Sequence, residues 1–175
     1  MRAPHTITMT QLAELASREP HPLVAIDGRS GAGKTVAAAH LGAALRLPVV
    51  HLDDFVPGWD GLRQGVEAVR HGIALPAARG QRAGCESWDW NAGGAGPFVR
   101  IDAAAGLIIE GCGAAAAVRG LTDLAVWIAA PTKVRMARLE GRSDWDAYAP
   151  HAAMWALQES ALVKEFGWPR RKLVL

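Results

Sequence analysis

Residues 28–35 read GRSGAGKT, a complete match to the G-x-x-x-x-G-K-[ST] pattern of a phosphate-binding loop. An apolar run at 23–26 leads into them and an alanine-rich segment at 35–47 follows, so the loop is expected to join a buried strand to a helix. In that setting, main-chain N–H groups and the N-terminus of the helix converge on a polyphosphate. The pattern therefore favours a nucleotide phosphate site over a glycine-rich turn that binds no ligand.

Two side chains of this loop have distinct expected roles. Lys34 can reach the β- and γ-phosphates as a mobile positive charge, and the hydroxyl of Thr35 can bind Mg²⁺. The residues expected to hold the nucleotide are Gly28, Ser30, Gly31, Ala32, Gly33, Lys34 and Thr35. We therefore expect ATP and Mg²⁺ as cofactors.

Short apolar segments alternate with helical patterns along the rest of the chain. Strands are expected at 23–27, 49–52, 107–109, 124–128 and 172–175, and helices at 10–18, 35–47, 61–71, 131–140 and 149–166. Continuously apolar strands between helices are typical of a parallel sheet that is covered on both faces. We predict one α/β domain over residues 1–175, with three layers and a mainly parallel sheet of about five strands. The stretch 74–97 is expected to be irregular.

Carboxylates follow two of the predicted strands. Asp53 and Asp54 come after the second strand, and Glu110 ends the third. Because ligands bind at the carboxyl ends of parallel strands, these acids are expected beside the phosphate loop. Asp53 is the candidate base for a substrate hydroxyl and a candidate metal ligand, Glu110 is a candidate Mg²⁺ ligand, and Asp54 is a candidate substrate contact. The alternative is that these acids only cap turns and helices.

Three arginines follow the fourth predicted strand at helical spacing. Arg135 and Arg138 are three residues apart and share a helix face, and Arg142 follows four residues further on. An arginine face is commonly a solvated surface. Here the segment 135–146 is expected to act as a lid, with Arg135 on the nucleotide and with Arg138 and Arg142 stabilising charge in the transition state.

The segment 58–98 is expected to bind the second substrate. Trp88 and Trp155 are candidates for stacking on a flat molecule, and Asp89 is a candidate partner for its hydroxyl groups. A role in the core or in an interface explains Trp88 equally well, and packing in the core is the favoured explanation for Trp155.

Four features occur in order along the chain: the phosphate loop, HLDDF at 51–55, IIEG at 108–111 and the arginines of 135–142. Together they resemble the uridine kinase-like branch of P-loop kinases, which also includes phosphoribulokinase-like and pantothenate kinase-like enzymes. The resemblance covers residues 23 to about 166. It implies the P-loop NTPase fold and transfer of a phosphoryl group from ATP to a hydroxyl of a small molecule, such as a nucleoside.

For individual residues, the resemblance implies that Asp53 is the catalytic base and that Glu110 and Thr35 help to hold Mg²⁺. It also implies that the arginines belong to the lid. Members of that branch usually carry a β-hairpin lobe over the nucleoside and a Tyr-Asp element that touches the acceptor. The corresponding stretch here is short and glycine-rich, with Trp88-Asp89-Trp90 at about the place of that element.

Composition narrows the partners. Half of the residues are hydrophobic, which is enough for one core, and a net charge of +2 is too small to indicate nucleic-acid binding. No apolar run approaches the roughly 18 residues that cross a membrane. Cys85 and Cys112 lack metal-ligand spacing and the N-terminal residues are polar, so a cytoplasmic location is expected. The expected partners are a nucleotide and a small-molecule acceptor; a homodimer stays open.

Two other functions stay open at this point. One is a switch protein that binds or hydrolyses ATP without a small-molecule acceptor. The other is a P-loop kinase for a sugar acid, a vitamin precursor or an antibiotic. A GTPase is disfavoured, because the chain has no N/T-K-x-D motif for guanine.

Overall fold

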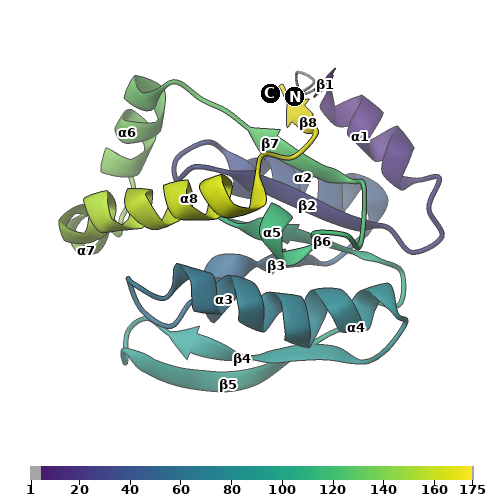
Figure 1. The fold of residues 1–175 in the computed structure, drawn as a ribbon, viewed down its shortest axis with the longest axis horizontal. Helices are drawn as coiled ribbons and strands as arrows, with labels where there is room; N and C mark the ends of the chain where they lie inside the picture. Colours follow the sequence, from purple (N-terminus) through teal and green to yellow (C-terminus); the bar gives the residue numbers. More distant parts are fainter. Residues whose placement is uncertain (1–4, 175) are drawn as a thin grey trace.

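A six-stranded sheet runs through the centre of the computed structural model, which describes residues 5–174 (Figure 1). Its strands are β1 (His5–Ile7), β2 (Leu23–Gly28), β3 (Val49–His51), β6 (Leu107–Glu110), β7 (Ala125–Ile128) and β8 (Arg171–Leu173). Their order is β1-β8-β7-β2-β6-β3, and every neighbouring pair is parallel. The prediction of a mainly parallel sheet is confirmed. It has six strands where about five were expected, because the mostly polar segment of β1 also pairs.

The helical segments alternate with these strands along the chain. The α-helices are α1 (Met9–Ala16), α2 (Lys34–Leu45), α3 (Leu62–Val69), α4 (Leu75–Ala78), α5 (Ala114–Ala117), α6 (Thr132–Glu140), α7 (Trp145–Tyr148) and α8 (Ala152–Phe166). The 3₁₀ turns η1 (Leu52–Phe55) and η3 (Ala149–His151) and the π-helical turn η2 (Arg70–Ala74) lie between them. Within residues 5–174, no helix combines the length and the apolar character needed to span a membrane.

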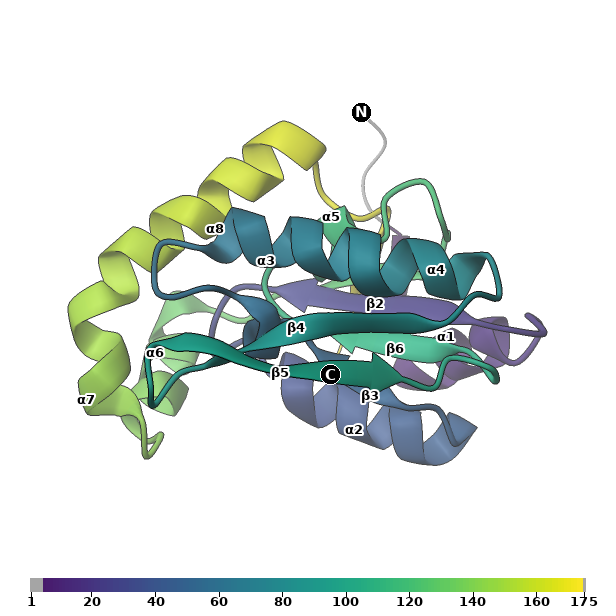
Figure 2. The ribbon, with the colours of Figure 1, turned by 90° about the horizontal axis from the view of Figure 1, so that it is seen from below.

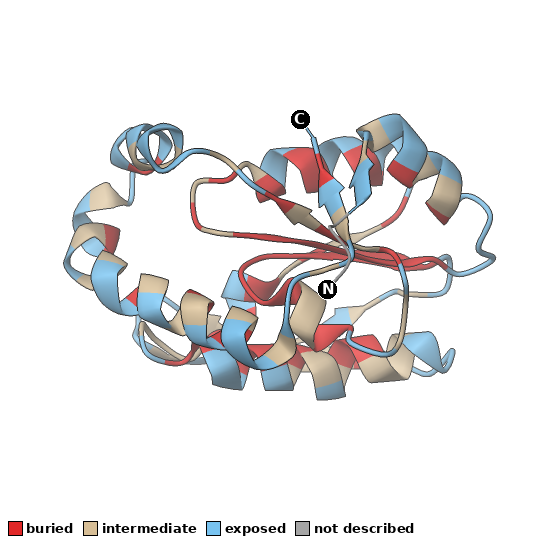
Figure 3. Cartoon of the chain, turned by 45° about the horizontal axis from the view of Figure 1, so that its top comes forward, coloured by how far each residue is buried: buried red, intermediate tan, exposed pale blue. Residues whose placement is uncertain are grey.

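Helices cover both faces of the sheet (Figure 2). The side chains of β2 alternate between the two faces, as the period of a strand requires. Val24 and Ile26 pack with α1 and α2 on one face, whereas Leu23 and Ala25 pack with α3, α5 and α8 on the other. Figure 3 shows the buried residues gathered in the sheet and on the helix sides that face it. The predicted three-layer α/β fold is therefore confirmed.

The expectation of an irregular stretch at 74–97 is wrong. Its second half belongs to an antiparallel hairpin of β4 (Ala83–Asp89) and β5 (Gly94–Ile101), which contacts η1 and η2. The glycines made these strands hard to predict from the sequence, because glycine is depleted in strands generally. Here they are needed for close packing: a Cβ on Gly84 would lie 2.7 Å from the Phe98 ring, and one on Gly96 would lie 2.5 Å from Ser87 Oγ.

Candidate functional site

The phosphate loop connects β2 to α2 through a tight turn of the main chain. Gly31 has a φ of 76°, in the left-handed region that glycine adopts without strain. A Cβ at this position would lie 2.5 Å from the main-chain oxygen of Arg135 in α6. Gly31 is therefore required both by the turn of the loop and by the close approach of α6. The predicted strand-loop-helix setting of the motif is present in the structure.

Lys34 is a buried cation inside this loop. It is 8% exposed, and its Nζ donates to the main-chain oxygen of Arg29 at 3.3 Å and to Cys112 Sγ at 3.4 Å. In the described part of the chain, no carboxylate lies within 4.0 Å of Nζ. Burial lowers the pKa of Lys34, but charge interactions with Cys112 first, and then with Asp53, Glu110 and Asp27, raise it above its usual value. The ammonium thus stays charged and lacks a direct anionic partner from the protein.

Glu110 and Thr35 meet at the carboxyl edge of the sheet. Thr35 Oγ1 donates to Glu110 Oε1 at 3.0 Å, and the same oxygen lies 2.7 Å from His51 Nδ1. These are oxygen ligands, which Mg²⁺ prefers. No cluster of three or more His, Cys, Asp or Glu residues within 5–174 can hold a metal unaided. That composition fits Mg²⁺, which takes most of its ligands from water and substrate phosphates.

His51 and Glu110 form a pair whose strength depends on pH. The hydrogen bond with Glu110 raises the pKa of His51 above 6.5, although partial burial opposes it. Because the folded pKa is raised, the pair contributes stability that is fully present below the unfolded pKa and is lost as pH rises through the folded pKa. We expect His51→Gln to lower the free energy of unfolding at about pH 5.5 by up to about 1 kcal/mol and to have less effect at about pH 8.5. Urea denaturation of both proteins at each pH measures this, and a deficit that grows with pH would contradict it.

Asp53 lies in η1, just beyond β3. A Cβ on Gly111, next to Glu110, would be 3.5 Å from Asp53 Oδ1, so the two acids flank one point of the sheet edge. The Asp53 side chain is accessible to solvent, but partial removal from bulk water raises its pKa, while the charges of Lys34 and Arg142 oppose the rise. Removal from water also raises the pKa of Asp54. A carboxylate with a raised pKa accepts a proton more readily.

The predicted lid arginines have separate partners. Arg135 donates to the main-chain oxygen of Ser30 at 3.1 Å, and Arg138 donates to those of Gly31 and Ala32 at 3.2 and 3.1 Å. Both guanidinium groups therefore dock α6 onto the phosphate loop. Arg142 forms an ion pair with Asp144, and its charge still acts on Asp53. Direct contact of these arginines with a nucleotide stays a prediction.

Aromatic side chains gather beside Asp53. Trp59 stacks on His151 with ring centroids 4.6 Å apart, and Trp90 lies 4.8 Å from Trp59. The indole N–H of Trp90 donates to the main-chain oxygen of Asp53 at 3.0 Å. Trp155 is 6.2 Å from Trp59 and buried, and its indole N–H has no hydrogen-bond partner within the described residues.

The structure places the predicted acceptor residues in different surroundings. Trp155 belongs to the aromatic group, although it is largely core. Asp89 accepts hydrogen bonds from the main-chain N–H groups of Asn91 and Ala92, so its Oδ1 caps the turn of the hairpin. Trp88 is half-buried in β4. Trp59 and His151 had no signal in the sequence, because the stacking joins residues that are far apart in the chain.

Comparisons with known proteins agree with this geometry. No protein-family model matches the chain, and no curated protein matches its sequence. A solved structure from Bacillus stearothermophilus, described as a possible uridine kinase, has a TM-score of 0.58 and 18% identity, covering 88% of this chain and 92% of that one. Another, from Silicibacter sp. TM1040 and provisionally described as a fructose transport system kinase, has a TM-score of 0.54 and 22% identity, covering 94% and 98%. This chain shares its fold with both structures.

One carboxylate fixes the phosphate loop, and no pattern in the sequence indicated this contact. Glu159 of α8 is buried, and its Oε1 accepts from the main-chain N–H and the hydroxyl of Ser30, both at 2.8 Å. The thiol of Cys112 donates to the same oxygen at 3.2 Å, and Arg29 lies 3.9 Å from Oε2. Since 129 positions separate Ser30 from Glu159, no local pattern could show this contact.

Asp27 is a second buried acid behind the loop. It accepts main-chain N–H bonds from Gly28, Gly113 and Ala115 at 2.7, 3.0 and 3.0 Å. Burial raises its pKa to about 6, and these bonds oppose the rise. Because the folded pKa lies above the unfolded value of 3.8, Asp27 makes the fold less stable as pH rises through this window.

Replacing Glu159 with alanine is expected to destabilise the fold by about 2–3 kcal/mol, because it leaves the buried N–H and hydroxyl of Ser30 without an acceptor. The exposed Glu165, in the same helix and paired with Arg63, is the matched control. Its alanine variant should destabilise the fold much less, because the pair with Arg63 is exposed to solvent. Urea unfolding measures both variants, and equal losses would show that Glu159 does not hold the loop.

Proposed function

We propose that this protein is an ATP- and Mg²⁺-dependent kinase that phosphorylates a hydroxyl of a small molecule. The observation that carries the proposal is the buried, charged Lys34 in a phosphate loop, with Thr35, Glu110 and Asp53 at the same sheet edge. A phosphoryl transfer site needs little more than held phosphates, neutralised charge and an oriented hydroxyl. The kinase descriptions of both similar structures support the same activity.

Each residue has a defined part in the proposed reaction. The loop N–H groups and Lys34 bind the phosphates, while Thr35 and Glu110 would hold Mg²⁺ through their oxygens. When bound, Mg²⁺-ATP supplies the phosphoryl group and neutralises charge on it. Asp53 orients the acceptor hydroxyl and takes its proton, and Arg142 lies on the same side to stabilise developing charge.

The aromatic group formed by Trp59, Trp90 and His151 supports an acceptor with a flat face. It lies against Asp53, to whose main-chain oxygen Trp90 is bonded. A planar ring could stack there with a hydroxyl directed toward the carboxylate. A nucleoside fits this description, whereas a sugar acid would gain less from the indole faces.

ATP consumption with Mg²⁺ tests the proposal against a panel of nucleosides, sugars, vitamin precursors and hydroxylated antibiotics, with mass detection of products. The expected result is a product heavier by one phosphoryl group, formed fastest from a nucleoside. Release of free phosphate without any phosphorylated product would favour a switch protein instead. Absence of both ATP binding and turnover would refute nucleotide chemistry at this site.

A further inference from the structure

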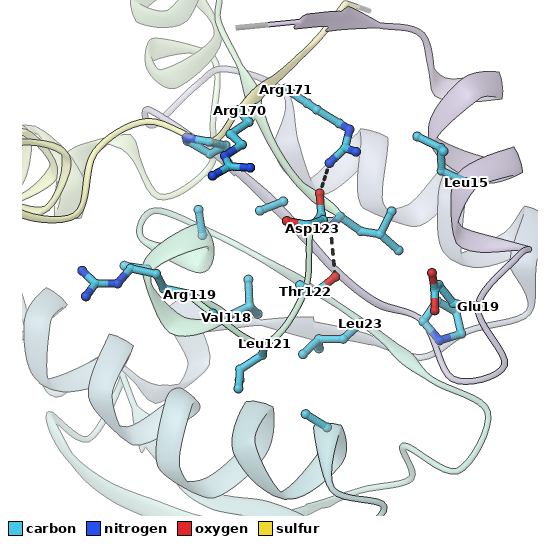
Figure 4. A pocket seen from close by; sticks show the side chains of 18 of the residues that line it. Leu15, Glu19, Leu23, Val118, Arg119, Leu121, Thr122, Asp123, Arg170 and Arg171 are labelled. Atoms are coloured by element: carbon cyan, nitrogen blue, oxygen red, sulfur yellow. Dashed lines mark hydrogen bonds between the residues drawn. The ribbon is translucent and has the colours of Figure 1, made fainter. Parts of the chain in front are cut away.

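A cavity lies at the amino ends of the central strands, at the opposite end of these strands from the phosphate loop (Figure 4). Its volume is about 850 Å³, within the range of sites that bind small molecules. Leu23 and Ala125 line it at the amino ends of β2 and β7, whereas the phosphate loop follows the carboxyl end of β2. Neither Lys34 nor Asp53 belongs to its lining, so the cavity is separate from the proposed kinase site.

Positive charge dominates the lining of this cavity. Its charged side chains are Arg18, Glu19, Arg119, Asp123, Arg170 and Arg171. Four guanidinium groups against two carboxylates leave two net positive charges. As far as residues 5–174 are concerned, none of these arginines lies within 4.0 Å of a carboxylate oxygen. Their charge is therefore available to an anion.

The cavity wall already orients two of the arginines. Arg171 donates to the main-chain oxygen of Asp123, as Figure 4 shows. Arg119 lies over the Phe166 ring, 5.2 Å from its centroid, and points away from Arg170 and Arg171 in Figure 4. A guanidinium group that is pre-oriented as that of Arg171 is loses less freedom when it binds an oxyanion with its planar fork.

Apolar side chains complete the lining. Leu15, Leu121 and Phe166 are among them, and Trp168 packs edge-on against Trp127 with centroids 4.4 Å apart. Trp168 remains 54% exposed, which leaves a large aromatic surface beside the arginines. Cationic and apolar walls in one cavity suit a ligand that carries both kinds of group.

We propose that this cavity binds a small organic phosphate with an aromatic or apolar body. The phosphate lies against Arg170 and Arg171, and the body packs on Leu121, Phe166 and Trp168. A phosphate monoester carries close to two negative charges at neutral pH, which match the two unneutralised positive charges of the lining.

Phenyl phosphate is the probe, titrated calorimetrically into the full chain in the presence of excess ADP and Mg²⁺. We expect phenol, which lacks the charge, and inorganic phosphate, which lacks the ring, to bind at least about tenfold more weakly. The Arg170→Gln/Arg171→Gln variant should lose at least about tenfold in affinity. The Arg82→Gln/Arg100→Gln variant removes two exposed arginines outside the cavity and should bind as the wild type does.

The location of the bound phenyl phosphate is tested on the wild-type protein by the chemical shifts of amide and indole N–H groups. Phenyl phosphate should shift the signals of Gly120, Leu121 and the Trp168 indole, and leave those of Gly31 and Gly33 in place. Lys34→Ala should not change the affinity. No binding at millimolar probe, unchanged affinity in the Arg170/Arg171 variant, or shifts only at the phosphate loop would each overturn the proposal. None of these outcomes bears on whether the protein is a kinase.

Discussion

Asp53→Asn is expected to lower kcat for phosphoryl transfer by about 10²–10⁴-fold, because an amide cannot accept the proton of the acceptor hydroxyl. Asp53 lies beside Glu110 and within the charge field of Lys34 and Arg142, and the substitution is nearly isosteric. The dissociation constant for ATP should therefore change little. Steady-state kinetics with the acceptor found by product screening, together with calorimetric ATP binding, measure the two effects separately.

Asp54→Asn is the matched comparison, since it removes the same charge from the next residue of η1. We expect it to alter KM for the acceptor and to leave kcat within about tenfold of wild type. The acid limb of the wild-type rate profile should lie above the ordinary Asp pKa of 3.8, because partial removal from water raises the pKa of Asp53. If Asp53→Asn turned over normally, Asp53 would not be the base.

The parts of this protein that sequence could predict are those specified by neighbouring residues. The phosphate loop is a contiguous motif, and the apolar runs 107–109 and 124–128 are buried strands whose type follows from composition alone. Glu110 and Asp53 follow strands, and parallel strands bring their carboxyl ends to one edge. Fold class and the approximate place of the site follow from this local information.

The remaining features depend on contacts between distant segments. Glu159 reaches Ser30 across 129 positions, and His51 reaches Glu110 across 59. The β4-β5 hairpin was missed for a different reason, because its glycines are explained only by the side chains of the facing strand, such as Phe98 over Gly84. In each of these cases, the physical cause is tertiary packing that single-sequence patterns do not contain.

The contacts of the predicted lid also depend on tertiary packing that the sequence pattern does not contain. Spacing correctly indicated that Arg135 and Arg138 share a helix face with a common direction. In the structure, that face meets main-chain oxygens of the phosphate loop. These contacts restrain the loop, so we expect Arg135 and Arg138 to act through the position of the loop. Only Arg142 extends its charge to Asp53.

Lys34→Ala is expected to lower kcat/KM for ATP by about 10²–10³-fold, the size of effect seen when one preorganised donor to a developing charge is removed. The reason lies in its surroundings. Nζ is held by the oxygen of Arg29 and the thiol of Cys112, both formally uncharged, and Cys112 stays a thiol because burial raises its pKa to about 12. The positive charge is thus not cancelled at contact distance and remains available to a phosphate.

Lys133→Ala is the control, because Lys133 is an exposed lysine at the start of α6 and its loss changes the net charge equally. Its ATP kinetics should match wild type. Loss of Lys34 should also raise the pKa of Asp53 further, since the nearby positive charge no longer opposes the rise. The acid limb of the residual activity should therefore move to higher pH. If the acid limb of the Lys34→Ala variant did not shift and its ATP kinetics were normal, Lys34 would be only a buried structural cation.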